Sequence, residues 1–262
     1  AALATVISQA VYLLGDLVFF RFGRGPLRPK LADFRIYPRL LPSILSVGSS
    51  AAIAQVMTSF QQVVLFRTLV EVGGNDQVAI MGAAYRVLLF GFIPLFGIGQ
   101  GLQPVIGMNF GARRYDRVKR ALIVFSLIST AISVAFWIPT FFFPGFILSW
   151  FITDPELVRN GAVYVRIFFA MFGFYGVVMT GLTFFQAMGR GMVAAFLAVF
   201  RQILAFAPLV LLLPRFFGVT GVWMALPVGD FITLLISSVF LFLQVRRLSR
   251  MQQADPLVAA TK

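Results

Sequence analysis

The chain has 262 residues, of which 60% are hydrophobic and 12% charged, with a net charge of +13 and a mean hydropathy of +0.92. Soluble domains carry about 25% charged residues, so this composition predicts a chain surrounded by a lipid bilayer. Histidine and cysteine are both absent, which excludes histidine-based catalysis, thiol chemistry and nearly every zinc site. We therefore expect no enzyme, with no catalytic residue, no metal site and no cofactor.

Seven apolar runs follow one another along the chain, each close to or above the ~20 residues that a helix needs to cross the hydrocarbon layer. Such long runs predict helices, because a membrane strand is shorter and alternates in polarity. The expected fold class is all-α, a polytopic membrane protein with seven transmembrane helices. The predicted helices cover residues 1–20, 41–70, 78–106, 121–143, 157–188, 192–213 and 219–243.

Basic residues lie in alternate loops, and the positive-inside rule places those loops in the cytoplasm. The opposite loops carry acids at Glu71, Asp76, Asp154 and Glu156. We expect a multi-pass protein of the cell (inner) membrane with a cytoplasmic C-terminus, bound to lipid and not to nucleic acid. Ala1 is then outside, and since the first run has no basic n-region or cleavage site, upstream sequence is expected to be missing. The sixteen basic residues are Arg21, Arg24, Arg28, Lys30, Arg35, Arg39, Arg113, Arg114, Arg117, Lys119, Arg120, Arg190, Arg246, Arg247, Arg250 and Lys262.

Two helical faces are candidates for contact with a small organic ligand. In the second run, polar residues recur at near-helical spacing, which predicts either hydrogen bonds between helices or a wet cleft; they are Gly48, Gln55, Thr58 and Gln62. In the fifth run, an aromatic and methionine face suits flat organic cations, although packed helix interfaces show the same pattern. Its residues are Tyr164, Phe168, Phe172, Tyr175 and Met179.

Charged residues also lie inside the apolar runs, where each costs about 3 kcal/mol or more if left alone near the bilayer centre. Asp230 is therefore expected to pair with an arginine, with Arg201 first and Arg166 or Arg86 as alternates. Such a pair either locks two neighbouring helices together or takes part in proton coupling. Both alternatives stay open.

The densest motif lies at the end of the third run, where residues 97–120 read GIGQGLQPVIGMNFGARRYDRVKR. It is not a nucleotide loop, because no strand precedes its glycines and no Walker lysine follows them. Gly97 with Gly101, and Gly107 with Gly111, form small-xxx-small pairs, which predict close helix packing. Polar residues beside the proline need partners in protein or water; the polar residues and the proline are Gln100, Gln103, Pro104 and Asn109.

This motif resembles the segment that closes the eighth helix of the multidrug and toxic compound extrusion (MATE) family and enters its next cytoplasmic loop. The resemblance lies in residues 100–120, including Gln100, Gln103, Pro104, Asn109, Gly111 and Arg114, with shorter stretches at 82–86, 186–189, 221–223 and 227–230. It covers essentially the whole chain and implies the C-terminal half of a transporter, helices six to twelve. One leftover helix (1–20) would end the missing N-terminal bundle, and a basic cytoplasmic linker (21–40), a six-helix bundle (41–245) and a cytoplasmic tail (246–262) would follow it.

The resemblance further implies secondary active efflux of drug-like, often cationic compounds by antiport with sodium or protons. The implied partners are membrane lipid, small organic substrates and the missing N-terminal bundle. One branch of the family binds the coupling cation with acids in helices seven and ten, but residues 48–62 and 172–188 contain no acid. The coupling site is therefore expected in the missing half. The alternative is a flippase for lipid-linked oligosaccharides or other lipids from the same exporter superfamily.

Overall fold

The computed structural model of the chain describes residues 2–22, 38 and 41–254. It divides into two compact units, Ala1–Ser46 and Val47–Lys262. In the first unit, α1 (Ala2–Phe22) is a single apolar helix whose described side chains are mostly exposed. Most of the predicted linker at 21–40, and the end of the predicted tail at 255–262, lie outside the described residues.

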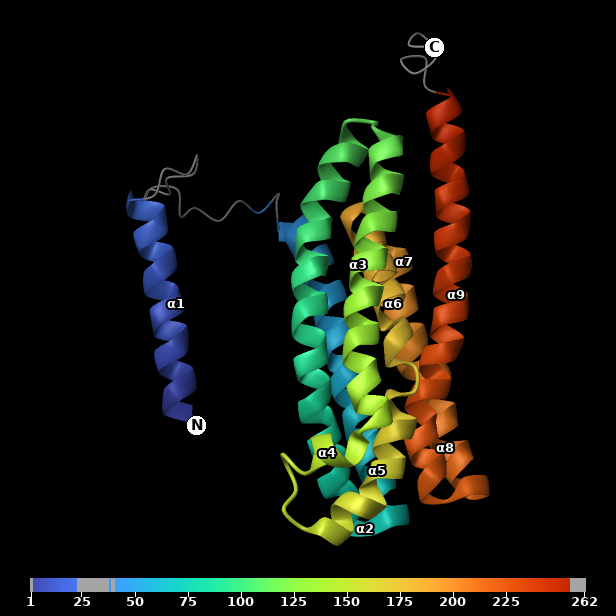
Figure 1. Ribbon diagram of the computed structural model, residues 1–262. Helices are drawn as coiled ribbons and strands as arrows, with labels where there is room; N and C mark the ends of the chain where they lie inside the picture. Colours follow the sequence, from blue (N-terminus) through green and yellow to red (C-terminus); the bar gives the residue numbers. More distant parts are fainter. Residues whose placement is uncertain (1, 23–37, 39–40, 255–262) are drawn as a thin grey trace. The chain divides into compact units, whose positions relative to one another are not determined.

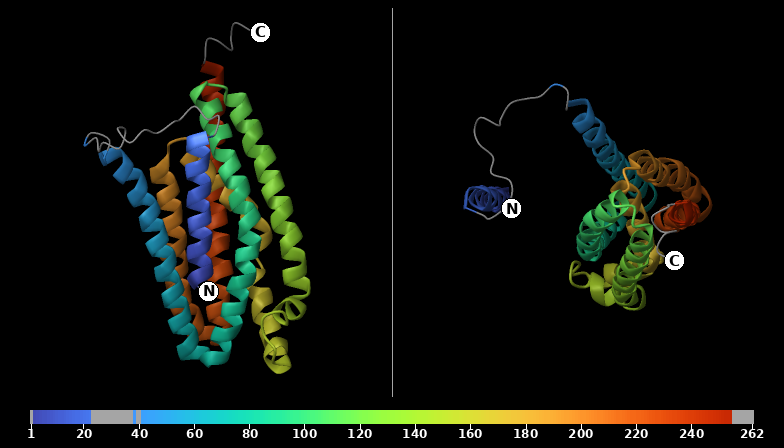
Figure 2. Two further views of the ribbon diagram at one scale, coloured as in Figure 1. Left: turned by 90° about the vertical axis from the view of Figure 1, so that its left-hand side faces the viewer. Right: turned by 90° about the horizontal axis from the view of Figure 1, so that it is seen from above.

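Helix α2 (Leu41–Gly111) consists of two long arms that reverse direction at Gly74. Gly74 has φ 73° and ψ −172°, a left-handed backbone conformation that glycine adopts without steric cost. Figure 2 shows the two arms meeting at this turn. The predicted break between the second and third runs is therefore confirmed, although both helices continue further into the turn than the apolar runs alone indicate.

The rest of the bundle also consists of helices and short helical turns in the described part of the chain (Figure 1). The predicted fifth span is two helices joined by a 3-10 turn, and the sixth contains a π-helical turn, η3. In chain order the elements are α3 (Tyr115–Phe142), α4 (Pro144–Leu148), α5 (Pro155–Phe169), η2 (Phe172–Phe174), α6 (Tyr175–Ala187), α7 (Gly191–Val199), η3 (Phe200–Ala205), α8 (Phe206–Phe217) and α9 (Val219–Ala254).

Several helix ends differ from the predicted spans, and two of these differences have a clear local cause. Helix α5 begins before the apolar run, because the Asp154 side chain accepts hydrogen bonds from the backbone N–H groups of Glu156 and Leu157 at 2.9 and 3.4 Å and Pro155 suits the first helical position. Helix α9 continues to Ala254, past the predicted span end at residue 243, since Leu248 is fully buried against α2 and α3.

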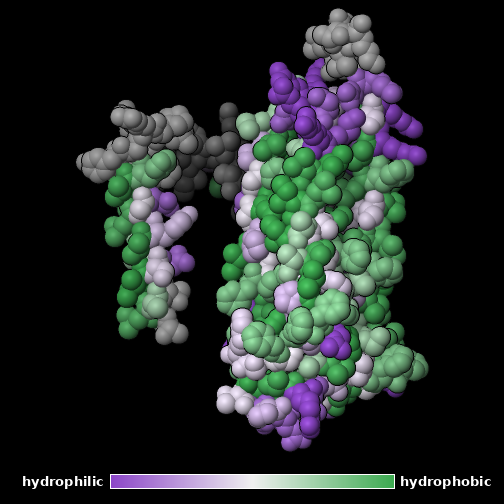
Figure 3. All heavy atoms as spheres, in the orientation of Figure 1, coloured by the Kyte–Doolittle hydropathy of each residue, from purple (hydrophilic) through white to green (hydrophobic). Residues whose placement is uncertain are grey.

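Five helical segments of the described chain are long and apolar enough to cross a membrane. The first contains both arms of α2, and α1 adds a shorter apolar stretch, Val6–Phe19. In Figure 3, hydrophilic residues of the second unit gather where α2 turns into α3 and where α9 ends, above a broad hydrophobic band. The chain is therefore an all-α, multi-pass membrane protein. The five segments are Gln55–Gly111, Tyr115–Phe142, Pro155–Ala187, Met192–Phe217 and Val219–Gln253.

The core of the second unit depends on large aromatic side chains and on one very close helix contact. Phe169 and Trp223 are fully buried in its main hydrophobic cluster. On α6, a Cβ atom added to Gly176 would lie 2.4 Å from the carbonyl carbon of Ser129 on α3. Only glycine permits the two backbones to approach this closely, which is a common device between membrane helices.

Candidate functional site

An ion pair in the membrane-spanning part of the bundle joins η3 to α9. Arg201 Nε lies 2.7 Å from Asp230 Oδ1, and the two side chains are 23% and 20% exposed. Each charge therefore has an opposite charge within hydrogen-bonding distance, which offsets much of the cost of leaving water. The predicted pairing of Asp230 with Arg201 is confirmed.

The guanidinium group of this pair also lies over an aromatic ring. Arg201 Cζ is 5.2 Å from the centre of the Tyr175 ring, a cation–π distance. Tyr175 is itself buried, with the rings of Phe92 and Phe172 centred 4.9 and 5.9 Å away. The charged group therefore rests on the main hydrophobic cluster instead of standing apart from it.

The residue after Arg201 connects the same turn to the first arm of α2. Gln202 Nε2 donates a hydrogen bond of 2.7 Å to Thr58 Oγ1, whereas Gln202 Oε1 is buried without a partner. Figure 2 shows the first arm of α2 beside α7 and α8 in both views. Because η3 is π-helical, a geometry often found at functional sites, one turn presents contacts to both α9 and α2. We call Thr58, Tyr175, Arg201, Gln202 and Asp230 the polar node.

The predicted polar face of the second run is divided by the structure. Thr58 joins the polar node, which agrees with the prediction of hydrogen bonding between helices. Gln55 and Gln62 are exposed on the bundle surface, and the side-chain environment of Gly48 lies outside what the structure describes. Sequence reasoning missed Gln61, a buried neighbour of Gln62. It also missed Gln202, because this residue lies in an apolar run and belongs to no recognisable motif.

The predicted aromatic face of the fifth run lies in the core. Phe168, Phe172 and Tyr175 are buried, while Tyr164 and Met179 are half-buried against the same cluster. Tyr164 stacks on Trp223 with ring centres 5.5 Å apart. The structure thus favours the packing alternative for this face, since α2, α3 and α9 all contribute residues to the cluster around it.

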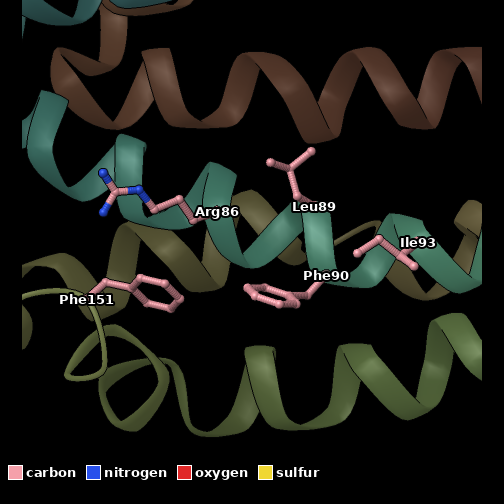
Figure 4. Close-up of a pocket in the computed structure, with 5 residues that line it drawn as sticks. All are labelled: Arg86, Leu89, Phe90, Ile93 and Phe151. Atoms are coloured by element: carbon pink, nitrogen blue, oxygen red, sulfur yellow. The ribbon is translucent and has the colours of Figure 1, made fainter. Parts of the chain in front are cut away.

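The two alternate partners of Asp230 lie on the surface instead. Arg86 lines a hollow of about 330 Å³ between the second arm of α2 and the segment after α4. Figure 4 shows Arg86 with the apolar side chains around it, which are Leu89, Phe90, Ile93 and Phe151. Arg166 lines a second, larger groove and donates from Nε to the backbone oxygen of Phe141 at 3.0 Å. Neither forms an ion pair within the described residues.

The family-like motif forms the turn between α2 and α3. Asn109 Nδ2 donates to the carbonyl oxygen of Val105 at 2.8 Å, and the backbone N–H of Arg114 donates to the carbonyl oxygen of Asn109 at 2.9 Å. Gln100, Pro104, Gly111 and Arg114 are exposed, and Gln103 is half-buried.

The prediction of close packing at the glycine pairs of this motif is only partly right. A Cβ atom on Gly101 would lie 3.7 Å from the Phe125 side chain, and one on Gly107 would lie 3.7 Å from the carbonyl oxygen of Ala187. Added Cβ atoms on Gly97 and Gly111 would meet no atom within 4 Å. The prediction is wrong for these two residues, because no element of the described chain packs against their side of α2.

Comparison with known proteins finds similarity to one family and to several of its curated and solved members. The MatE family model matches residues 50–211, more than half of the chain. The multidrug export protein MepA of Staphylococcus aureus (strain MSSA476) is 24% identical over 251 residues, which are 95% of this chain and 54% of MepA. A FAD transporter of Shewanella oneidensis is 26% identical over 184 residues, covering 70% of this chain and 40% of that protein. The chain thus spans about half the length of the curated relatives it matches.

Solved structures agree at the level of the fold. An outward-facing multidrug resistance MATE transporter of the MOP superfamily superposes with a TM-score of 0.85 at 21% identity, over 95% of this chain and 56% of that one. An inward-facing structure described in the same words superposes with a TM-score of 0.77 at 20% identity, over 95% and 58%. The arrangement of helices described above is therefore the one found in these transporters.

Proposed function

Because the chain belongs to the MatE family, whose members are transporters and not enzymes, we propose that it works in multidrug export as one half of a secondary active antiporter. Its relatives include proteins named as multidrug exporters, and it spans about half of their length. The expected substrates are drug-like organic compounds, often cationic. The other half of the substrate path would come from the part of the relatives that this chain does not cover.

The observation that carries this proposal is the exposed amide face on the first arm of α2. Gln55 and Gln62 are exposed although they lie in an apolar, membrane-spanning segment. Lipid offers an amide no hydrogen-bond partner, so such groups occur at membrane depth where they face protein or a water-filled path. This face would line the cleft for substrate, and the half-buried Thr58 beside it accepts a hydrogen bond from Gln202.

The coupling ion is proposed to be sodium or a proton, bound mainly outside this bundle. The carboxylate of Asp230 already accepts a hydrogen bond from Arg201, and antiport needs a group whose occupancy differs between the two access states. A carboxylate held by an internal cation is poorly placed to exchange a second one. The polar node would therefore keep the bundle rigid while substrate binds at the face of the bundle and the ion binds outside it.

The protein is proposed to lie in the inner membrane with a cytoplasmic C-terminus. Single cysteines at Arg114 and Arg247 should resist an impermeant thiol reagent in intact cells, whereas a cysteine at Asn75 should react. All three positions are exposed, and the chain has no cysteine of its own. Equal labelling at the three positions would contradict this orientation.

The transport proposal is tested with the chain and any flanking sequence that its gene encodes, reconstituted in liposomes. Efflux of a fluorescent organic cation should follow an imposed sodium or proton gradient, and replacing both Gln55 and Gln62 by leucine should reduce it about tenfold or more. Gln253→Leu, an exposed amide at the far end of α9, serves as the control. Gradient-independent movement of lipid without any dye flux would instead favour the flippase alternative.

A further inference from the structure

Arg166 has an unusual position for a charged residue in an apolar bundle. It lies on α5, its side chain is exposed, and among the described residues no carboxylate pairs with it. Its Nε donates to the backbone oxygen of Phe141 at 3.0 Å. That oxygen belongs to the last turn of α3, where helix carbonyls have no partner in their own helix. The bond therefore fixes the guanidinium group at the level of the end of α3.

Several large aromatic residues mark the same end of the bundle. Phe142, Phe143, Phe146 and Trp150 are between 56% and 68% exposed around the end of α3 and the segment after it. Tryptophan, as at position 150, is enriched at the boundary between hydrocarbon and headgroups. The end of α3 is thus expected at the headgroup level of one leaflet, at the opposite end of the bundle from the hydrophilic residues around the α2–α3 turn (Figures 1 and 3).

An apolar groove of about 540 Å³ runs beside this guanidinium group. Its walls extend from the level of the end of α3 towards the middle of the bundle, because α5 and α9 both begin near that end and run in this direction. From Met224 to Phe231 the α9 wall is about 10 Å long. Apart from Arg166, the residues that line the groove are Phe141, Ile167, Ala170, Met171, Met224, Pro227, Val228 and Phe231.

We propose that this groove binds an anionic phospholipid, with its phosphate on Arg166 and one acyl chain along α5 and α9. The remaining N–H groups of Arg166 form a planar set of donors that matches phosphate oxygens. Arg166 is the single charged residue among those that line the groove, and the uncharged walls beside it match the acyl chain of a lipid. Such a site would neutralise an arginine for which the described bundle provides no acid.

The proposal is tested with the purified protein, including any flanking sequence of its gene, in a delipidated detergent. Binding of phosphatidylglycerol is measured by native mass spectrometry, beside diacylglycerol and inorganic phosphate. Arg166→Gln should weaken phosphatidylglycerol binding about tenfold, the effect of losing a charge-assisted hydrogen bond. Arg159→Gln, an exposed arginine two turns earlier on α5 that does not line the groove, should change nothing.

Two further variants separate lipid binding from a purely structural role of Arg166. Arg166→Lys keeps the charge but loses the planar donors and the Nε bond to Phe141, so it should recover only part of the binding that Arg166→Gln loses. Val228→Trp should fill the groove and weaken phosphatidylglycerol binding without touching the arginine. The proposal would be overturned if Arg166→Gln and Arg159→Gln weakened phosphatidylglycerol binding equally. It would also be overturned if diacylglycerol bound as tightly as phosphatidylglycerol, or if a copurifying protein segment occupied the groove.

Discussion

Arg201 and Arg166 are the same residue type in two apolar helices of one bundle, but their charges have different environments. Arg201 lies 2.7 Å from Asp230 and over the ring of Tyr175, so the protein itself supplies its counter-ion. Arg166 is exposed, bonds a carbonyl at a helix end, and lacks a carboxylate partner in the described chain. The comparison teaches that the charge of an arginine in an apolar run needs a partner, which either the fold or the membrane must supply.

The largest effect is expected at the inner arginine. Asp230→Asn or Arg201→Gln alone leaves one charge without its partner, which should reduce the free energy of unfolding by about 3–5 kcal/mol. The double variant should lose less than the sum of the two single losses, because no unpaired charge remains. Thermal unfolding in detergent measures all three variants. If the losses of the two single variants simply added up in the double variant, Arg201 and Asp230 would not stabilise each other.

The second effect compares two glycines in the same way. Gly176→Ala places a Cβ atom 2.4 Å from the Ser129 backbone, and such overpacking should cost about 1–3 kcal/mol. Gly97→Ala meets no atom within 4 Å, so it should be neutral or stabilise α2 by up to about 1 kcal/mol. Thermal unfolding of both variants checks the prediction. Equal melting temperatures would show that α3 and α6 are further apart than described.

A smaller effect is expected where the polar node meets α2. Thr58→Val removes the oxygen that accepts the hydrogen bond from Gln202, and hydrogen bonds between membrane helices contribute about 0.6 kcal/mol on average. Gln202→Leu should cost no more than this, because it also removes the buried oxygen that has no partner. A double-mutant cycle on detergent stability measures the coupling, and a coupling energy of zero would show that this contact is not made.

Sequence reasoning predicted the fold well because the bilayer imposes strong rules on composition. Long apolar runs must be helices, and the Gly73–Asp76 break is one that only a turn can explain. The Arg201–Asp230 pair was also predictable, since an acid that lies in an apolar run needs a partner within reach. These inferences use only chain position and the cost of an unpaired polar group.

The features that the sequence did not predict depend on which way each side chain points around its helix axis. Phe168 and Gln62 each fit a periodic face, but periodicity does not say whether that face meets a neighbouring helix, lipid or water. In the structure, Phe168 is buried and Gln62 is exposed. The π-helical turn at η3 likewise shifts the facing of Arg201 and Gln202 by a fraction of a turn, which no spacing rule for α-helices anticipates.

The smallest effect on folding is expected at the outer arginine. In delipidated detergent, Arg166→Gln should change the free energy of unfolding by no more than about 0.5 kcal/mol, as exposed substitutions usually do. Among the described residues, the polar contact that this variant loses is the hydrogen bond to the carbonyl of Phe141, which water can replace at a helix end. Added phosphatidylglycerol should then raise the melting temperature of the parent more than that of the variant, since a ligand of the folded state stabilises in proportion to its occupancy.

The difference between the two arginines becomes measurable in this way. Arg201→Gln should be equally unstable with and without lipid, because its partner is Asp230. Arg166→Gln should differ from the parent only when lipid is present. If Arg166→Gln were as unstable as Arg201→Gln without lipid, its bond to Phe141 would be essential to the fold, and the distinction between a charge held by protein and one held by membrane would fail.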